Sequence, residues 1–171
     1  GAGSLAFEKV ESKIKKDGTD TIKATATYNG STVRNADIKW ESENPEIATV
    51  DGGKITGVGY GTTTVKASWT ADNGKTYTNS ATVNVVYDGL YLSDAQNEVT
   101  MPQGSKQEIV WTIQNMGEYS KGSTGEGYNP SSDVTWKSND ETVATVDSAG
   151  VITACNLAEG ETTASTTVTV S

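Results

Sequence analysis

The sequence contains no histidine and one cysteine, Cys155, and these two shortages exclude several kinds of site. Without histidine, the Ser-His-Asp and Cys-His catalytic arrangements and histidine-ligated zinc are all ruled out. A lone cysteine cannot form an intrachain disulfide. The chain also lacks any apolar run approaching the roughly 18 residues that a membrane-spanning helix requires. We therefore expect no membrane insertion of this fragment.

Basic residues are scarce as well. Lysine and arginine number 13 against 22 aspartates and glutamates, which gives a formal net charge of -9. A nucleic-acid-binding protein needs a basic surface that displaces counterions from phosphates, so we expect no nucleic acid partner. An acidic coat is typical of an exposed, secreted module that stays soluble.

Apolar residues make up only 34% of the chain, which is too few to line thick helical cores. Strands with one apolar face each need fewer of them. Ile22, Ala24 and Ala26 alternate with polar residues, and so do Val65 and Trp69 with their neighbours. This period of two predicts strands with those side chains inward. No segment of ten or more residues has helical periodicity, so the fold class is all-β.

An internal repeat organises the chain. Residues 37–51 and 133–147 lie 96 positions apart and share seven of fifteen residues, in the pattern Trp-x-Ser…Ala-Thr-Val-Asp. Such a match indicates a duplication. A repeat of this length fits a small sandwich domain and is too long for a solenoid unit. We predict two domains, 5–88 and 89–171.

The first domain has about seven strand signals separated by turn residues. The predicted strands are 5–14, possibly split in two, 20–28, 37–42, 46–50, 53–57, 62–70 and 77–86. That number fits a Greek-key sandwich. Asn73-Gly74 lies between two alternating runs and predicts a type I′ hairpin.

Around the first copy of the repeat, short motifs follow one another in a fixed order: Trp40-Glu-Ser42, Asn44-Pro45, Ala48-Thr-Val-Asp51, Gly53-Lys-Ile-Thr-Gly57 and Gly61-Thr-Thr-Thr-Val65. In this order they resemble the bacterial immunoglobulin-like family, group 2. The second copy resembles it from Val134 to Thr153 and then departs, because Ala154 stands where the family has glycine. The resemblance implies two tandem immunoglobulin-like Greek-key β-sandwich domains.

The motif residues have an architectural interpretation. Trp40 and Trp136 stand on alternating strands whose apolar face must pack between sheets, and truncating such a buried indole costs about 3–5 kcal/mol. We expect the structural core to include Trp40, Trp136, Val50 and Val146. A role for Trp40 as a sugar platform is the alternative.

The second domain carries an extra stretch, the loop 117–132, which makes its Ile109–Trp136 segment nine residues longer than Ile22–Trp40. Long loops at the end of a sandwich are frequent binding sites, and tyrosines among small polar residues make adaptable contacts. The candidate ligand contacts are Tyr119, Tyr128, Glu118, Lys121 and Glu126. The alternative is a solvated insertion with no ligand.

The end of the second domain is shortened, and two interpretations compete. Residues 161–171 could be the penultimate strand, with the last strand cut off or supplied elsewhere. Alternatively, residues 165–170 are the last strand, matching Ser80–Val85, and one hairpin is deleted. We favour the second because the terminal patterns are closer. Either arrangement leaves an unpaired edge that invites another chain.

These features predict a non-enzymatic extracellular segment of a larger bacterial cell-surface or secreted protein. The resemblance implies a spacer or adhesion module, present as a monomeric fragment, with a host or cell-surface protein or a glycan as partner. The alternative is a carbohydrate-binding accessory module of a secreted carbohydrate-active enzyme or a phage tail protein. No catalytic residue and no cofactor are predicted. No metal ligand is predicted either, because the oxygen-rich turns lack the EF-hand pattern of a calcium site.

Overall fold

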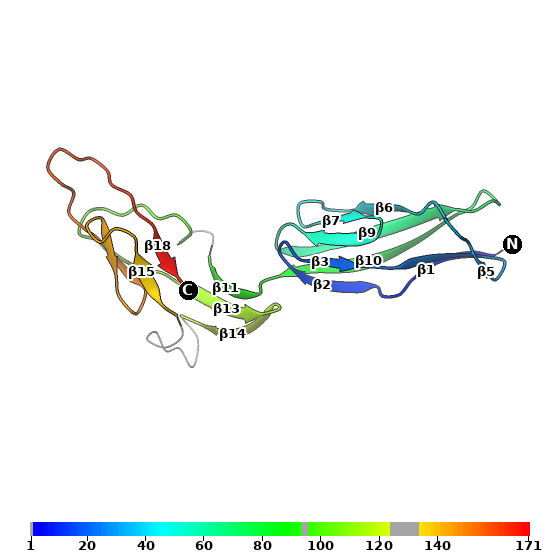
Figure 1. The fold of residues 1–171 in the computed structure, drawn as a ribbon, viewed down its shortest axis with the longest axis horizontal. Coiled ribbons are helices and arrows are strands. Elements are labelled where there is room, and N and C mark those ends of the chain that lie inside the picture. The colour runs from blue at the N-terminus through cyan, green and yellow to red at the C-terminus, as the bar shows by residue number, and fades with distance from the viewer. Residues whose placement is uncertain (1, 94–95, 124–133) are drawn as a thin grey trace. The chain divides into compact units, whose positions relative to one another are not determined.

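The computed structural model describes residues 2–93, 96–123 and 134–171, and all of its regular elements are strands (Figure 1). The predicted all-β class is therefore confirmed. The chain divides into two compact units, Gly1–Asp88 and Gly89–Ser171.

The first unit has ten strands in three sheets, with orders β1-β4-β5, β2-β10-β9-β6 and β3-β8-β7. The strands are β1 (Gly3–Phe7), β2 (Glu11–Lys15), β3 (Thr19–Thr21), β4 (Ala24–Tyr28), β5 (Ser31–Thr32), β6 (Lys39–Ser42), β7 (Ala48–Asp51), β8 (Lys54–Gly57), β9 (Gly61–Thr70) and β10 (Thr76–Val86).

Two predicted strands are each divided between two sheets. The predicted strand 5–14 becomes β1, which pairs antiparallel with β4, and β2, which pairs parallel with β10. The predicted strand 20–28 becomes β3 and β4. Between these, Ile22 is 1% exposed and its amide donates to the Gly53 carbonyl. Alternation predicts the buried side chains correctly, but it does not indicate where a strand changes partner.

Two apolar clusters fill the first unit. One gathers Ile14, Ile22, Ala48, Ile55, Val65, Ala81, Val83 and Val85. The other gathers Leu5, Ala26, Ala67, Trp69 and Ala71. Their members alternate along β9 and β10, so these two long strands carry core side chains over most of their length.

The hairpin between β9 and β10 forms where it was predicted, but its turn is not type I′. That turn needs positive φ at both central residues, and of the pair Asn73-Gly74 only Gly74 has it, at 79°. The Gly74 amide donates to the Ala71 carbonyl, and the Asn73 side chain accepts from the Lys75 amide. The asparagine side chain thus stabilises a turn one residue longer than predicted.

The described residues of the second unit form eight strands in three sheets, with orders β11-β13-β14, β12-β17-β16 and β15-β18. The strands are β11 (Gly89–Leu92), β12 (Lys106–Glu108), β13 (Trp111–Asn115), β14 (Glu118–Gly122), β15 (Trp136–Ser138), β16 (Ala144–Val146), β17 (Val151–Ala154) and β18 (Val168–Val170).

Matching backbone hydrogen bonds relate the two units. The Ile22 amide donates to the Gly53 carbonyl at 2.9 Å, and the Ile109 amide donates to the Gly150 carbonyl at 3.0 Å. The sheet β3-β8-β7 likewise corresponds to β12-β17-β16, in the same antiparallel pairing. The repeated segment therefore adopts the same local structure twice.

The last strand, β18, occupies the place that β9 has in the first unit. β9 pairs antiparallel with β6 and sets Val65 opposite Ser42. β18 pairs antiparallel with β15 and sets Val168 opposite Ser138. Since β15 is the repeat of β6, β18 corresponds to the penultimate strand of the first unit.

Hydrogen bonds beside these pairs give the same correspondence. The Glu43 amide donates to the Thr64 carbonyl at 2.9 Å, and the Asn139 amide donates to the Thr167 carbonyl at 3.0 Å. The favoured interpretation, in which residues 165–170 match the last strand Ser80–Val85, is therefore wrong. The Thr-Val-x-Val pattern misled it because it suits either strand. Within the described residues, the second unit has no counterpart of β10.

Candidate functional site

The first part of the predicted loop 117–132 is a strand. β14 pairs with β13, with a register shift beside Ile113 and Gln114. The connecting residues Met116 and Gly117 both have positive φ, at 47° and 85°, as a type I′ turn requires. The prediction missed this turn because methionine rarely adopts positive φ. The corresponding turn of the first unit, Asn29-Gly30, has φ of 50° and 82° and offered the template.

Three of the five predicted contact residues lie on β14. Glu118 and Tyr119 are exposed, and Tyr119 has 54% of its surface accessible. Lys121 is half-buried. Glu126 and Tyr128 lie outside the described residues. The hairpin therefore presents one acidic and one aromatic side chain to solvent.

The base of this hairpin is fixed by a buried serine. The Ser123 hydroxyl, on a residue only 6% exposed, accepts from the Trp111 amide at 3.0 Å. The Ser123 amide in turn donates to the Trp111 carbonyl at 3.0 Å. A backbone anchored in this way holds β14 against β13, so Tyr119 projects from an ordered strand.

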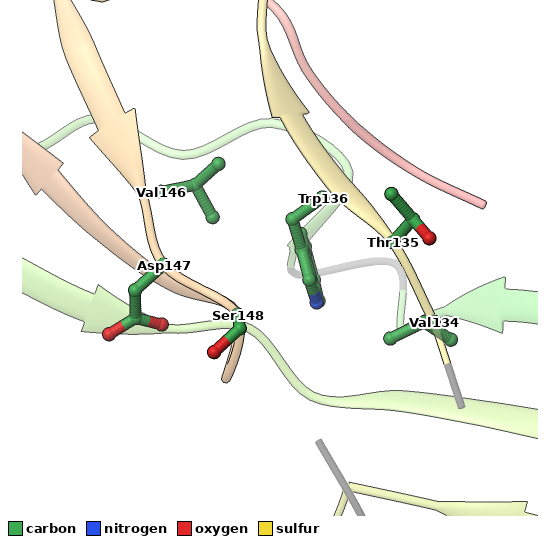
Figure 2. Close-up of a pocket in the computed structure, with 6 residues that line it drawn as sticks. All are labelled: Val134, Thr135, Trp136, Val146, Asp147 and Ser148. Carbon is green, nitrogen blue, oxygen red and sulfur yellow. The ribbon is translucent and has the colours of Figure 1, made fainter. Parts of the chain in front are cut away.

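An open hollow of about 260 Å³ lies beside Trp136, lined also by Val134, Thr135, Val146, Asp147 and Ser148. Figure 2 shows the indole standing between the strand that carries Thr135 and the segment that carries Val146 and Asp147. The indole nitrogen is buried and has no hydrogen-bond partner among the described residues. This volume is below the range of about 300–1,000 Å³ that is usual for small-molecule sites.

The carboxylate in this hollow is already engaged. Asp147 accepts hydrogen bonds from the Ala149 amide at 2.9 Å and the Val151 amide at 3.0 Å. It stabilises the turn before β17 and is not paired with a second carboxylate. Among the described residues that line this hollow, Asp147 is the only carboxylate.

The predicted core residues lie at the margins of the cores. Trp40 and Val50 are half-buried and pack against the first apolar cluster. Trp136 and Val146 are also half-buried. Trp40 stacks on Phe7, with ring centroids 5.1 Å apart. This stacking covers a face of Trp40 that a sugar platform would need open.

The second aromatic pair of the first unit is also packed. Trp69 is 6% exposed and stacks on Tyr77 at 5.7 Å, so its predicted inward orientation is confirmed. Tyr60, 43% exposed, stacks on Tyr87 at 3.6 Å, and the Lys16 ammonium lies 5.8 Å from the Tyr60 ring centroid. These pairs leave few aromatic faces of the first unit open for a flat ligand.

Acidic side chains act mainly in turns and local pairs. No three of the Cys, Asp and Glu side chains in the described ranges gather closely enough to hold a metal ion. Burial would raise the pKa of Asp20, but hydrogen bonds from Lys9, Ser12 and the Thr21 amide outweigh it and lower that pKa. The Lys9 ammonium lies 2.7 Å from the Asp20 carboxylate.

Asp140 has a lowered pKa for a similar reason. The hydroxyl and amide of Thr142 both donate to its carboxylate, at 2.6 and 3.0 Å. In the first unit Asn44 takes this place, and its side chain accepts from the Glu46 amide at 3.0 Å. The carboxylates of Asp20 and Asp140 thus both stabilise local structure.

The described part of the chain contains no helix long and apolar enough to cross a bilayer.

Two curated proteins are similar to this chain in sequence. It is 27% identical over 159 residues to an uncharacterised protein of Clostridium acetobutylicum, covering 91% of this chain and 15% of that protein. It is 28% identical over 151 residues to ice-binding protein 1 of Shewanella frigidimarina, covering 86% of this chain and 16% of that protein. The chain thus spans about a sixth of each curated relative.

Among solved structures, domains 5–6 of the S-layer protein SbsC align with a TM-score of 0.43 and 19% identity. That alignment covers 98% of this chain and 89% of the S-layer chain. The model of the bacterial Ig-like domain family, group 2, matches residues 8–80, which lie within the first unit. This match identifies residues 8–80 as a bacterial Ig-like domain of group 2.

Proposed function

We propose that this chain is a non-enzymatic spacer or adhesion segment of a larger bacterial protein that is secreted or stands at the cell surface. Family membership of residues 8–80 supports this proposal. So does the small share, 15% and 16%, that the chain covers of two long relatives. We further propose that the second unit is a divergent copy of the first, because its repeat forms matching hydrogen bonds.

The pairing of β2 with β10 carries the proposal. These strands lie near the beginning and the end of the first unit and run parallel, with five register pairs from Glu11–Thr82 to Lys15–Val86. A force that pulls the two ends of the unit apart shears β2 against β10. All the hydrogen bonds between these two strands are then loaded at once and must break together. A module built in this way suits a protein under tension. Its closely packed aromatic pairs suit a spacer better than a ligand site.

Single-molecule stretching tests this interpretation. Handles on Glu11→Cys and Val86→Cys load the β2–β10 ladder in shear, and handles on Glu11→Cys and Thr82→Cys unzip it from one end. Cys155→Ser removes the native thiol in both proteins. The proposal predicts a clearly higher unfolding force in the shear arrangement. Equal forces in the two arrangements would count against a load-bearing role.

A second candidate function is a carbohydrate-binding accessory module, and the exposure of Tyr119 favours it. A tyrosine at 54% exposure on an ordered strand offers a face on which a sugar ring can stack. A glycan array with the wild type and Tyr119→Ala tests it, with Tyr60→Ala as the matched control in the first unit. A signal lost only in Tyr119→Ala supports this function, and no signal in any protein eliminates it.

A further inference from the structure

The first unit contains two Asn-Gly pairs, and both lie in exposed hairpin turns. Asn29-Gly30 connects β4 to β5, and Asn73-Gly74 lies between β9 and β10. An asparagine that precedes glycine is open to attack on its side chain, because glycine has no Cβ to shield its own backbone nitrogen. The hydrogen bonds of the two turns decide which asparagine can react in the folded protein.

The turn at Asn73 engages every group that would take part in this reaction. The side-chain oxygen of Asn73 accepts from the Lys75 amide at 2.9 Å, and its side-chain nitrogen donates to the Tyr77 hydroxyl at 3.2 Å. The Gly74 amide, whose nitrogen would be the nucleophile, donates to the Ala71 carbonyl at 2.9 Å. A reaction at Asn73 therefore has to break three hydrogen bonds first.

The turn at Asn29 leaves the same groups free. Both Asn29 and Gly30 are exposed, with φ of 50° and 82°, as in a type I′ turn. Among the described residues, neither the side-chain amide of Asn29 nor the backbone amide of Gly30 has a hydrogen-bond partner. The backbone amide of Asn29 donates to the Ala2 carbonyl at 2.9 Å. Water thus reaches both the nucleophile and the leaving group.

We propose that Asn29 is a site of spontaneous deamidation, with water as the co-reactant. Hydroxide removes the proton of the Gly30 amide, and the Gly30 nitrogen attacks Cγ of Asn29. The bond from this nitrogen to Cγ forms, the bond from Cγ to Nδ2 breaks, and the departing nitrogen takes a proton from water and leaves as ammonia. No oxidant or reductant takes part.

The five-membered succinimide that results is opened by a molecule of water at either of its two carbonyl carbons. Addition at Cγ breaks the new bond and gives aspartate. Addition at the backbone carbonyl of Asn29 breaks the original peptide bond and gives isoaspartate, whose main chain runs through Cγ. Both products replace a neutral amide with a carboxylate, and isoaspartate also lengthens the backbone of the turn by one carbon.

The longer backbone matters because a two-residue turn sets the register of its strands. The two residue pairs between β4 and β5 follow directly from this turn. Just after β5, the Val33 amide donates to the Ala26 carbonyl at 2.8 Å, and Val33 packs against the second apolar cluster. Isoaspartate at position 29 therefore loosens β5 and the part of the cluster that Val33 covers.

The second unit does not share this site. Its corresponding turn is Met116-Gly117, which has no side-chain amide, and its sequence contains no Asn-Gly pair. The reaction thus alters the first unit alone, and it stands apart from the proposed function, which needs no modification.

The test is incubation of the full chain in mildly alkaline buffer, followed by digestion and mass spectrometry. Deamidation is expected to be at least about ten-fold faster at Asn29 than at Asn73, because the bonds held only at Asn73 must break first. In concentrated urea the two asparagines should react at similar rates, which would assign the difference to the fold. Labelling by an isoaspartate methyltransferase counts the isoaspartate formed.

Variants assign the reaction to named groups. Asn29→Gln should suppress it, since the longer side chain would have to close a six-membered ring. Gly30→Ala should slow it by shielding the nucleophile, and a Cβ there meets nothing within 4 Å. Tyr77→Phe is the reciprocal control, because it removes the hydroxyl that holds the Asn73 amide. It should speed deamidation at Asn73 several-fold and leave the rate at Asn29 unchanged.

Thermal unfolding measures the consequence. The isoaspartate form should melt at a lower temperature than Asn29→Asp, which adds the same charge without lengthening the backbone. Equal deamidation rates at Asn29 and Asn73 in the folded chain overturn the proposal. So does an Asn29 that reacts in urea and stays intact in the folded chain. An isoaspartate form that melts like Asn29→Asp would overturn the loosening of β5.

Discussion

The two units correspond in the sheet that holds β7 or β16 and differ in the sheet that holds β9 or β18. In both, a strand of the repeated segment, β7 or β16, lies at the edge of an antiparallel sheet, β3-β8-β7 or β12-β17-β16. The facing sheet has four strands in the first unit, whereas β15 and β18 stand as a pair in the described part of the second. The repeat thus supplies one strand to each of these two sheets, β6 and β7 or β15 and β16, and the remaining strands lie outside it.

The difference extends to the core. The two apolar clusters of the first unit include five residues of β9 and β10 that are at most 2% exposed, namely Val65, Ala67, Ala81, Val83 and Val85. In the described part of the second unit the buried apolar residues are Ile109, Trp111, Val134 and Ile152. Because apolar burial is the main favourable term in folding, we expect the second unit to unfold first on heating.

Replacing Gly53 or Gly150 with alanine should lower the free energy of unfolding most, and by different amounts in the two units. Both glycines have positive φ, at 89° and 78°. A Cβ at Gly53 would lie 2.5 Å from the Ile22 carbonyl oxygen, whereas one at Gly150 would lie 2.5 Å from the Trp136 ring. A backbone carbonyl cannot move aside easily, but the indole is a side chain that borders an open hollow. We expect Gly53→Ala to cost about 2–4 kcal/mol and Gly150→Ala about 1–2 kcal/mol.

Urea unfolding with a separate probe for each unit measures both changes. Gly52→Ala is the control, since a Cβ there meets nothing within 4 Å although φ is 57°. A loss at Gly150 as large as that at Gly53 would contradict the looser surroundings of Trp136.

Valine truncation on β9 and on β18 should give the next largest effect. Val65 is fully buried on β9, which is paired with β10, and its counterpart Val168 is half-buried. We expect Val65→Ala to lower the free energy of unfolding of the first unit by roughly 2 kcal/mol. Val168→Ala should lower that of the second unit by less than about 1 kcal/mol. Equal losses in chemical unfolding would show that Val168 is covered as fully as Val65.

Acid should lower the stability of the two units by different amounts, and this is the smallest of the predicted effects. The lowered pKa of Asp20 means that its contribution to stability is present above the unfolded value of 3.8 and is lost as the pH falls through the folded pKa. Gln107 occupies this place on β12, so the second unit has no such group there. Asp20→Asn should therefore flatten the acid limb of the first unit.

The expected change is about 1 kcal/mol or less, since the pair with Lys9 is partly exposed. Thermal unfolding between roughly pH 5 and pH 2 measures it. Gln107→Asn is the matched control and should leave the acid limb of the second unit unchanged. If the first unit of Asp20→Asn still loses as much stability in acid as the wild type, other carboxylates cause that loss.

The sequence allowed much of the fold to be predicted because the local patterns are strong. Alternation places Trp69 inward, and the group 2 motifs identify the family of residues 8–80. The partner of a strand could not be predicted in the same way. The Thr-Val-x-Val pattern of residues 165–170 suits any half-buried strand, and only its ladder with β15 shows which one it is.

The candidate site was predictable only in part for the same reason. Tyr119 was recognised as a candidate contact, but the strand that carries it depends on Met116 in a conformation that methionine rarely adopts. The open edge beside Val168 has no sequence motif of its own. It is recognised by comparison, because β10 lies beside β9 in the first unit and no strand lies there beside β18 in the described part of the second unit.

Residue-resolved hydrogen exchange of the free chain tests the central comparison most directly. The amides of Val168 and Val170 face the open edge, whereas those of Val65 and Ala67 face β10. The account predicts fast exchange at Val168 and Val170, slow exchange at Val65 and Ala67, and intermediate protection at Thr169, which faces β15. Protection at Val168 and Val170 equal to that at Val65 and Ala67 would contradict it.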